Sequence, residues 1–251
     1  MWMMFYMVAS RKVLLVVPCY NEEKRLPVNE FIQFVEQGHH ILFADDGSND
    51  GTVALLERVF QKQKNIRTYK APFNKGKAEV IRSAVAELNK IGIPHDIDWV
   101  GFWDADLATP LVEVEYLLDF QKNFSSESKA IIGSRVLRLG GNIKRSALRH
   151  YLGRGFATVA SLMLGLRCYD SQCGAKLFHK SLLTTAFGLP FISKWIFDVE
   201  ILLRIGQKNF IEVPLRNWED IPGSKIKIGR ELFRVLSDLI RIRYQYGKTK
   251  D

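Results

Sequence analysis

The stretch Trp99-Val100-Gly101-Phe102-Trp103-Asp104-Ala105-Asp106-Leu107 decides the fold of this chain. Its first five residues carry no charge, and two carboxylates one residue apart follow them at once. A strand that is covered on both faces of an α/β sheet is continuously apolar, so residues 99–103 are predicted to form a buried strand. Ligands of such sheets bind at the carboxyl ends of the strands, which is where Asp104 and Asp106 fall.

The pair Asp104 and Asp106 is typical of a site for a hard divalent cation. Two neighbouring carboxylates repel each other unless a cation lies between them. Mg²⁺ or Mn²⁺ suits oxygen ligands and usually binds together with the phosphates of a substrate. The alternative is structural: Asp106 would cap a helix that begins near Pro110, and Asp104 would be a turn residue.

Apolar runs alternate with helical patterns along the chain. Further short strands are expected at residues 13–17, 41–44, 66–70, 130–133 and 211–215. Helical spacing of apolar residues is found at residues 53–60, 77–88, 144–166, 197–205 and 230–246. This alternation predicts a mostly parallel sheet with right-handed crossovers, in which Pro214 suits an edge strand.

The composition limits the class of protein. The 251 residues, 47% of them hydrophobic, suffice for one large globular domain or for one domain with an appendage. The three cysteines form no CxxC pair, which indicates a reducing compartment and neither a disulfide framework nor a zinc site. No apolar run reaches the roughly 18–20 residues of a membrane span, and the charges that follow residues 1–9 stand in the wrong order for a signal peptide.

The net charge indicates the kind of partner. A formal charge of +9 favours an anionic partner. No nucleic-acid-binding motif occurs and the basic residues lie mostly in the second half, so phosphates and lipid headgroups are expected and nucleic acid is not. The sequence predicts no particular oligomeric state.

Polar side chains follow the ends of several predicted strands. They are Tyr20, Glu22, Asp45, Asp46, Asp104, Asp106 and Arg135. Because the carboxyl ends of parallel strands meet at one edge of a sheet, we expect these side chains to converge. Their convergence predicts a site for a nucleotide or a phosphate.

Several short polar blocks follow one another along the chain in a characteristic order. They are Pro18-x-Tyr20-Asn21-Glu22, Asp45-Asp46-Gly47-Ser48-x-Asp50-Gly51-Thr52, Asn74-x-Gly76-Lys77, Asp104-Ala105-Asp106 and Gly133-Ser134-Arg135. As an ordered set, these blocks resemble the family 2 glycosyltransferases with the GT-A fold.

Later blocks extend this resemblance. They are Asp170-Ser171-Gln172-Cys173-Gly174-x-Lys176-Leu177-Phe178, Trp195-x-Phe197-Asp198-Val199-Glu200 and Trp218-x-x-Ile221-x-Gly223-Ser224-Lys225. They are similar to the dolichyl-phosphate β-glucosyltransferases and, more distantly, to the dolichyl-phosphate mannose synthases. The resemblance covers about residues 13–246.

The resemblance implies a fold and an activity. The expected fold is α/β, a Rossmann-like GT-A domain over residues 1–225, with a basic amphipathic helix over residues 226–251. The expected reaction is metal-dependent, inverting transfer of a hexose, glucose from UDP-glucose above all, to a polyprenyl phosphate. Alternatives are mannosyl transfer from GDP-mannose and transfer to a saccharide hydroxyl in the synthesis of cell-surface polysaccharide. Ala108 stands where many mannose synthases carry a glutamine, which favours glucose.

The resemblance also assigns site residues. The nucleotide sugar would be bound by Pro18, Tyr20, Glu22, Asp45, Asp46, Lys77, Asp104, Ala105, Asp106 and Lys225. Within this set, Tyr20 would lie against the base, Asp46 would bond to its edge, and Asp104 and Asp106 would hold Mg²⁺ or Mn²⁺. The acceptor phosphate would be bound by Arg135 together with Arg145 or Arg149 of the next helix.

The roles of several further polar residues stay open. A lipid phosphate is already anionic at neutral pH, so its attack needs no general base, whereas a sugar hydroxyl needs one. Asp198 and Glu200 are therefore either a base, carboxylates that order the acceptor arginines, or helix-face carboxylates that pair with nearby lysines. Side chains that could line a sugar pocket are Asp170, Gln172, Lys176, Trp195 and Trp218, although a core position is favoured for Trp195.

The C-terminal segment suggests contact with a membrane. Eight Lys or Arg residues and two acidic residues lie between Lys225 and Lys250. A basic amphipathic helix can lie on an anionic lipid surface, although Leu232, Leu236 and Leu239 could equally pack on the sheet. Residues 1–9 are too short for the N-terminal membrane helix of the eukaryotic enzymes. We therefore expect a peripheral protein on the cytoplasmic face of a membrane.

Overall fold

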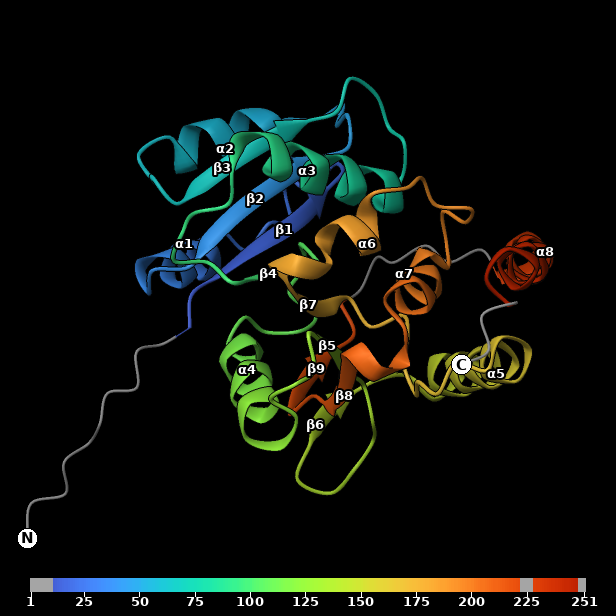
Figure 1. The fold of residues 1–251 in the computed structure, drawn as a ribbon. Helices are drawn as coiled ribbons and strands as arrows, with labels where there is room; N and C mark the ends of the chain where they lie inside the picture. Colours follow the sequence, from blue (N-terminus) through green and yellow to red (C-terminus); the bar gives the residue numbers. More distant parts are fainter. Residues whose placement is uncertain (1–10, 222–227, 248–251) are drawn as a thin grey trace, which may run out of the picture.

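The fold is a central sheet with helices on both faces (Figure 1). It is seen in a computed structural model, which describes residues 11–221 and 228–247. For residues 147–150, 152 and 228–233 the description is limited to the backbone. The strands are β1 Val13–Cys19, β2 His40–Asp45, β3 Ile66–Lys70, β4 Trp99–Trp103, β5 Ala130–Ser134, β6 Asn142–Lys144, β7 Ala175–His179, β8 Phe210–Pro214 and β9 Asn217–Glu219. The α-helices are α1 Val28–Glu36, α2 Thr52–Phe60, α3 Lys77–Ile91, α4 Glu113–Phe124, α5 Ala147–Leu164, α6 Leu183–Phe187, α7 Phe197–Ile205 and α8 Ile228–Tyr246.

The main sheet has seven strands in the order β3-β2-β1-β4-β7-β5-β8. Only β7 runs antiparallel to its neighbours, and it pairs with both β4 and β5. The mostly parallel α/β sheet that the sequence predicts is therefore confirmed. The expected edge position of Pro214 is also confirmed, since β8 pairs with β5 alone in this sheet.

The sheet separates two hydrophobic cores. Alternate residues of β1 point to opposite faces, so Leu14 and Val16 join one core while Val13, Leu15 and Val17 join the other. The first core is completed by residues of α3, α6, α7 and α8, and the second by residues of α1, α2 and α4. Burial on both faces explains why the strands are continuously apolar.

The segment after β5 differs from the prediction. Residues 142–144 form β6, which pairs in parallel with β9, and α5 begins at Ala147 rather than at residue 144. Three residues are too short for a strand to be recognised from periodicity, and the partner strand lies more than 70 residues further along the chain.

Helix α8 packs on the rest of the molecule through α5 and α7. Leu239 and Ile242 are fully buried in the first core, whereas Leu236 remains exposed. The predicted division of the chain at residue 225 stays a prediction. Among the helices that are described, none is long and apolar enough to cross a bilayer.

Gly101 in the centre of β4 provides a test of this packing. A Cβ atom there would overlap the carbonyl oxygen of Lys176 and the side chain of Leu177 on β7. We expect Gly101→Ala to lower the free energy of unfolding by about 1–3 kcal/mol, the usual cost of overpacking, in urea denaturation. Gly155→Ala in α5, where the new Cβ meets no atom within 4 Å, is the control and should leave stability equal or higher. Equal stability of both variants would contradict the β4–β7 packing.

Candidate functional site

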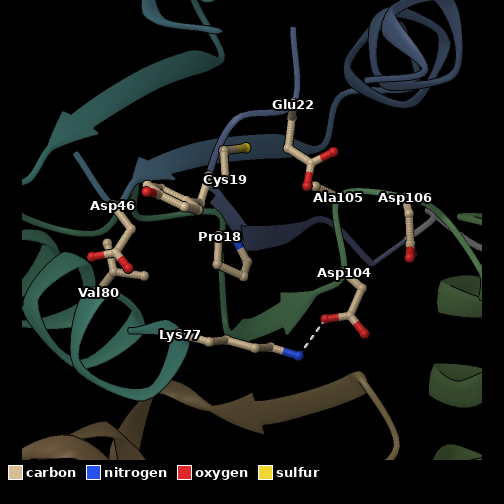
Figure 2. Close-up of a pocket in the computed structure, with 10 residues that line it drawn as sticks. Pro18, Cys19, Glu22, Asp46, Lys77, Val80, Asp104, Ala105 and Asp106 are labelled. Carbon is tan, nitrogen blue, oxygen red and sulfur yellow. Dashed lines mark hydrogen bonds and ion pairs between the residues drawn. The ribbon is translucent and has the colours of Figure 1, made fainter. Parts of the chain in front are cut away.

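The predicted strand ends meet in one hollow, which we call the carboxylate cleft (Figure 2). It is lined by Pro18, Cys19, Tyr20, Glu22, Asp46, Lys77, Val80, Asp104, Ala105 and Asp106. The cleft surrounds about 550 Å³ of space open to solvent. It brings together all but two of the predicted nucleotide-sugar residues. Asp45 does not line it, and Lys225 lies outside the described residues.

The turn after β4 places the two aspartates. Trp103 is fully buried and donates its indole N–H to the carbonyl oxygen of Thr109 at 2.7 Å. Asp106 Oδ1 accepts from the amide of Ala108 at 3.1 Å. Helix α4 begins only at Glu113, so Asp106 stabilises its own turn and does not cap that helix. The structural alternative considered for Asp106 is therefore wrong in this respect.

Asp104 lies between two segments that are distant in sequence. Its Oδ1 forms an ion pair with the ammonium group of Lys77, at the start of α3. Its Oδ2 lies so close to Gly174 that a Cβ at that position would overlap it. Burial lowers the pKa of Lys77, but Asp104 and Asp198 more than offset this, so the pKa is raised and Lys77 stays charged. This contact explains why position 174 needs a glycine, which could not be seen from the sequence.

The charges around Asp106 suit a bound cation. Burial and the charge of Asp104 raise the pKa of Asp106. Burial also raises the pKa of Glu22, and its buried Oε2 has no hydrogen-bond partner in the described part of the chain. Within residues 11–221 and 228–247, no three His, Cys, Asp or Glu side chains form a complete metal site. Asp104 and Asp106 therefore fit a hard divalent cation whose remaining ligands are phosphate oxygens or water.

Asp46 supports the wall of the cleft. Its two carboxylate oxygens accept from the amides of Lys75 and Gly76, each at 2.8 Å. The residue therefore holds the turn that leads into α3 and also lines the cleft, and its expected bond to the edge of a base stays a prediction. Asp45 is buried beside it, and its Oδ2 accepts from the amide of Ser48 at 3.1 Å.

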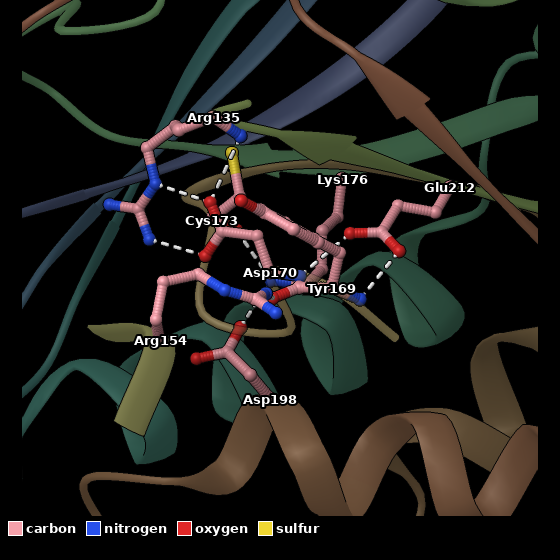
Figure 3. Close-up of polar contacts among 8 residues, drawn as sticks. All are labelled: Arg135, Arg154, Tyr169, Asp170, Cys173, Lys176, Asp198 and Glu212. Atoms are coloured by element: carbon pink, nitrogen blue, oxygen red, sulfur yellow. Dashed lines mark hydrogen bonds and ion pairs between the residues drawn. The ribbon is translucent and has the colours of Figure 1, made fainter. Parts of the chain in front are cut away.

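Arg135, at the end of β5, is held by a buried partner (Figure 3). Asp170 accepts from its Nε at 2.6 Å and its Nη2 at 2.7 Å, and from its backbone amide at 3.0 Å. The guanidinium also lies 5.5 Å from the ring centre of Trp218, which is itself buried. Asp170 and Trp218 were considered for a sugar pocket, but the structure uses both to position Arg135.

Arg145 has no such partner. It is half-buried, its guanidinium lies against Gly153 of α5, and no ion pair joins it to any described carboxylate. Burial and the nearby charge of Arg135 lower its pKa. Two close guanidinium groups that share one carboxylate make a favourable place for an anion. The side chain of Arg149 lies outside the described residues.

Lys176 and Asp198 form a buried ion pair behind the cleft (Figure 3). The ammonium group of Lys176, on β7, is 2.6 Å from Asp198 Oδ1 and also donates to the carbonyl oxygen of Cys173. Its side chain is 0% exposed, so the expectation that it lines a sugar pocket is wrong. The pair supports the turn that brings Gly174 against Asp104.

Glu200 is not brought to the carboxylate cleft. It is fully buried and accepts from Arg204 at 2.7 Å, from the Tyr246 hydroxyl at 2.9 Å and from the amide of Ile192 at 2.9 Å. These contacts tie α7 to α8. They leave Glu200 in the interior rather than beside a substrate.

Sequence reasoning missed Glu212 on β8. Its carboxylate accepts from the amides of Tyr169 and Asp170 at 2.6 and 2.7 Å (Figure 3). It thereby fixes the backbone that carries the partner of Arg135. A carboxylate inside an otherwise apolar strand is the sequence signal that could have indicated this role.

Comparison with known proteins shows what the chain resembles. The sequence profile described as glycosyl transferase family 2 matches residues 14–187. The dolichyl-phosphate beta-glucosyltransferase of Dictyostelium discoideum is 31% identical, and the match covers 92% of this chain and 73% of that protein. The Homo sapiens protein of the same name is 30% identical, covering 94% of this chain and 76% of that protein.

A solved structure shows the same fold. Glucosyl-3-phosphoglycerate synthase from Mycobacterium tuberculosis, in complex with Mn²⁺, uridine diphosphate and glucosyl-3-phosphoglycerate, matches with a TM-score of 0.65 at 19% identity. The match covers 97% of this chain and 82% of that one. The expected GT-A fold is confirmed.

Lys77 and a divalent cation would compete for the same oxygen of Asp104. We expect Lys77→Met to bind Mn²⁺ alone about three- to tenfold more tightly, as a partly exposed ion pair of about 1 kcal/mol implies, measured by electron paramagnetic resonance of free Mn²⁺. Lys77→Arg keeps the charge and is the control, with affinity within about twofold of wild type. Unchanged affinity in Lys77→Met would show that Lys77 does not shield Asp104.

The Arg135–Asp170 pair predicts a dependence of stability on pH. Burial raises the pKa of Asp170, but the bonds from Arg135 outweigh it and the pKa is lowered. The contribution of the pair is therefore present above the unfolded-state pKa of about 3.9 and is lost as the pH falls through the lower folded-state pKa. Asp170→Asn should lower the free energy of unfolding by about 3–5 kcal/mol at pH 7, because it leaves Arg135 without its charged partner.

Urea denaturation of wild type and Asp170→Asn at several pH values tests this. The difference between the two proteins should persist from pH 7 to about pH 4 and shrink below it. Asp119→Asn, a change of the same kind in α4, is the control. A difference that shrinks already between pH 7 and pH 5 would contradict the lowered pKa.

Proposed function

The chain belongs to glycosyl transferase family 2 and is a glycosyltransferase, and from this premise we propose that it transfers a hexose from a nucleotide sugar to a polyprenyl phosphate. The donor is UDP-glucose and the acceptor a dolichyl-type phosphate. The names of the relatives in Dictyostelium discoideum and Homo sapiens support glucose and dolichyl phosphate. The uridine diphosphate in the mycobacterial structure supports the nucleotide.

The proposal that the acceptor is a phosphate rests on one observation, the half-buried Arg145 beside Arg135. Asp170 neutralises only one of these two guanidinium groups, so a positive charge stays next to the cleft. The charge of Asp104 acts on Arg135, which indicates that the arginines lie near the carboxylate cleft. A phosphate held there would be beside a sugar whose diphosphate lies at Asp104 and Asp106.

The chemistry follows from these positions. One oxygen of the acceptor phosphate attacks the anomeric carbon, while the bond from that carbon to the diphosphate oxygen breaks, which inverts the anomeric configuration. The attacking oxygen is already ionised near neutral pH, so no proton has to be removed. Arg135 and Arg145 bind and orient the acceptor, and Lys77 is positioned to interact with the departing diphosphate.

The site also fits a divalent cation, Mg²⁺ or Mn²⁺. Asp104 and Asp106 would hold it, together with diphosphate oxygens and water. When bound, the cation supplies a Lewis acid that stabilises the charge on the leaving diphosphate. The Mn²⁺ in the mycobacterial structure supports this assignment.

Transfer to a saccharide hydroxyl is less well supported. That reaction needs a general base, and Asp198 is engaged by the buried ammonium group of Lys176. Glu200 is occupied by Arg204 and Tyr246 in the interior. Neither carboxylate is free to remove a proton in the cleft.

Attachment to the cytoplasmic face of an anionic membrane completes the proposal. The outer side of α8 exposes Leu236, Ile240 and Tyr244 at four-residue spacing. The side chains of Ile240 and Tyr244 are 61% and 81% exposed. The neighbouring α5 exposes Tyr151 and Leu162. Exposed apolar residues on a basic helix favour a position at the lipid surface without a span.

Radiolabelled transfer tests the reaction. Labelled UDP-glucose and GDP-mannose are each offered with Mg²⁺ or Mn²⁺, with a short polyprenyl phosphate or with the free polyprenol. We expect lipid product from UDP-glucose and the phosphate only. Release of uridine diphosphate with saccharide acceptors, without lipid product, would refute the proposal.

Arg145→Gln tests the acceptor site within the same assay. The loss of a charge-assisted contact should raise KM for the polyprenyl phosphate roughly tenfold or more and leave KM for UDP-glucose unchanged. Arg58→Gln, at an exposed position of α2, is the control. A change confined to the KM of the donor would contradict the role of Arg145.

A further inference from the structure

A second hollow, which we call the lysine groove, lies between the start of α3 and the segment ahead of α7. It is lined by Phe73, Asn74, Lys75, Ala78, Glu79, Phe191, Ser193 and Lys194 around about 600 Å³ of space open to solvent. It shares no lining residue with the carboxylate cleft. In Figure 1 the turn into α3 and the loop between α6 and α7 lie on the same side of the molecule as α8.

The groove carries unneutralised positive charge. Lys75 lies 5.1 Å from the ring centre of Phe73, and neither it nor Lys194 has a carboxylate partner among the described residues. The one acidic lining residue, Glu79, is held by Arg82 through bonds of 2.8 and 2.5 Å and also interacts with the charge of Lys75, so one carboxylate faces three cations, Lys75, Arg82 and Lys194. The charge of the groove therefore selects an anion.

The rim of the groove is apolar as well as cationic. Phe73 is 62% exposed, and Trp195, next to Lys194, is 45% exposed rather than in the core as expected. Leu189 of the same loop is also exposed. A small anion in solution would leave these side chains in water, whereas aromatic residues beside lysines are typical of the membrane–water interface.

We propose that the lysine groove binds the phosphodiester headgroup of an anionic phospholipid of the bilayer. Lys75 and Lys194 contact the headgroup oxygens, and Phe73 and Trp195 enter the interfacial layer beside it. This inference deepens the proposed membrane attachment and rests on it.

The two walls of the groove are tied to different parts of the enzyme. Asp46 of the carboxylate cleft holds the amides of Lys75 and Gly76 on one side. On the other side, the hydroxyl of Ser193 donates to Asp238 of α8 at 2.7 Å. A headgroup between the walls joins the cleft to α8, so the active-site opening is held at the membrane.

Flotation of the 251-residue chain with vesicles tests the site. The vesicles contain phosphatidylcholine alone or with phosphatidylglycerol, and no polyprenyl phosphate. We expect the Lys75→Gln/Lys194→Gln variant to bind the anionic vesicles roughly 20-fold more weakly than wild type, since each basic residue near the surface contributes about fivefold.

The matched control is Lys62→Gln/Lys64→Gln. It removes the same charge from exposed positions ahead of β3, which lie before the strand begins, whereas Phe73 and Lys75 of the groove follow its end. It should reduce vesicle binding less than threefold. Equal losses in the two variants would show that only the net charge matters, and would overturn the proposal that the lysine groove binds the headgroup.

A soluble short-chain phosphatidylglycerol, titrated against inorganic phosphate, separates a lipid from a free anion. We expect the lipid to bind at least tenfold more tightly, and Phe73→Ser to remove most of that difference. Equal affinity for the two probes overturns the lipid assignment.

The outcome of the vesicle experiment does not depend on whether the protein transfers a sugar. If the wild type floats with anionic vesicles and Lys75→Gln/Lys194→Gln floats equally well, the groove is refuted while the proposed reaction stands. If the wild type binds vesicles but transfers no sugar, the reaction is refuted and the groove is retained. Failure of the wild type to bind any anionic vesicle refutes both the groove and the membrane attachment.

Discussion

Repulsion between carboxylates at the end of a buried strand is the constraint on which the rest of the site depends. Asp104 and Asp106 leave the apolar β4 together, and burial and the charge of Asp104 raise the pKa of Asp106. The repulsion is reduced by Lys77 of α3, because its ammonium group forms an ion pair with Asp104.

The other charged groups are arranged in pairs that support one another. Asp198 neutralises the buried Lys176, and Asp170 neutralises Arg135. Breaking such a pair leaves a buried charge alone, which costs more than the pair contributes. The pairs thus hold the loops after β5 and before β7 in one arrangement, and they leave Arg145 as the group open to an anion.

The C-terminal half links this arrangement to the surface. Glu200 and Ser193 each contact α8, through Tyr246 and Asp238 respectively. These buried polar contacts fix the position of a helix whose outer face is apolar. The segment between α6 and α7 thus lines the lysine groove and contacts α8, so the proposed lipid headgroup would be linked to α8 through short contacts.

The sequence by itself determined the buried strand 99–103, the parallel sheet and most of the cleft, because apolar periodicity and strand-end position are local properties. It also indicated the family through blocks that keep their order. It did not distinguish Arg135, which is held by Asp170, from Arg145, which is not, nor did it show that Lys176 is buried or that Glu200 faces the interior. Only the tertiary structure decided these roles, because the partner of a charge is chosen by contacts between residues that lie far apart along the chain.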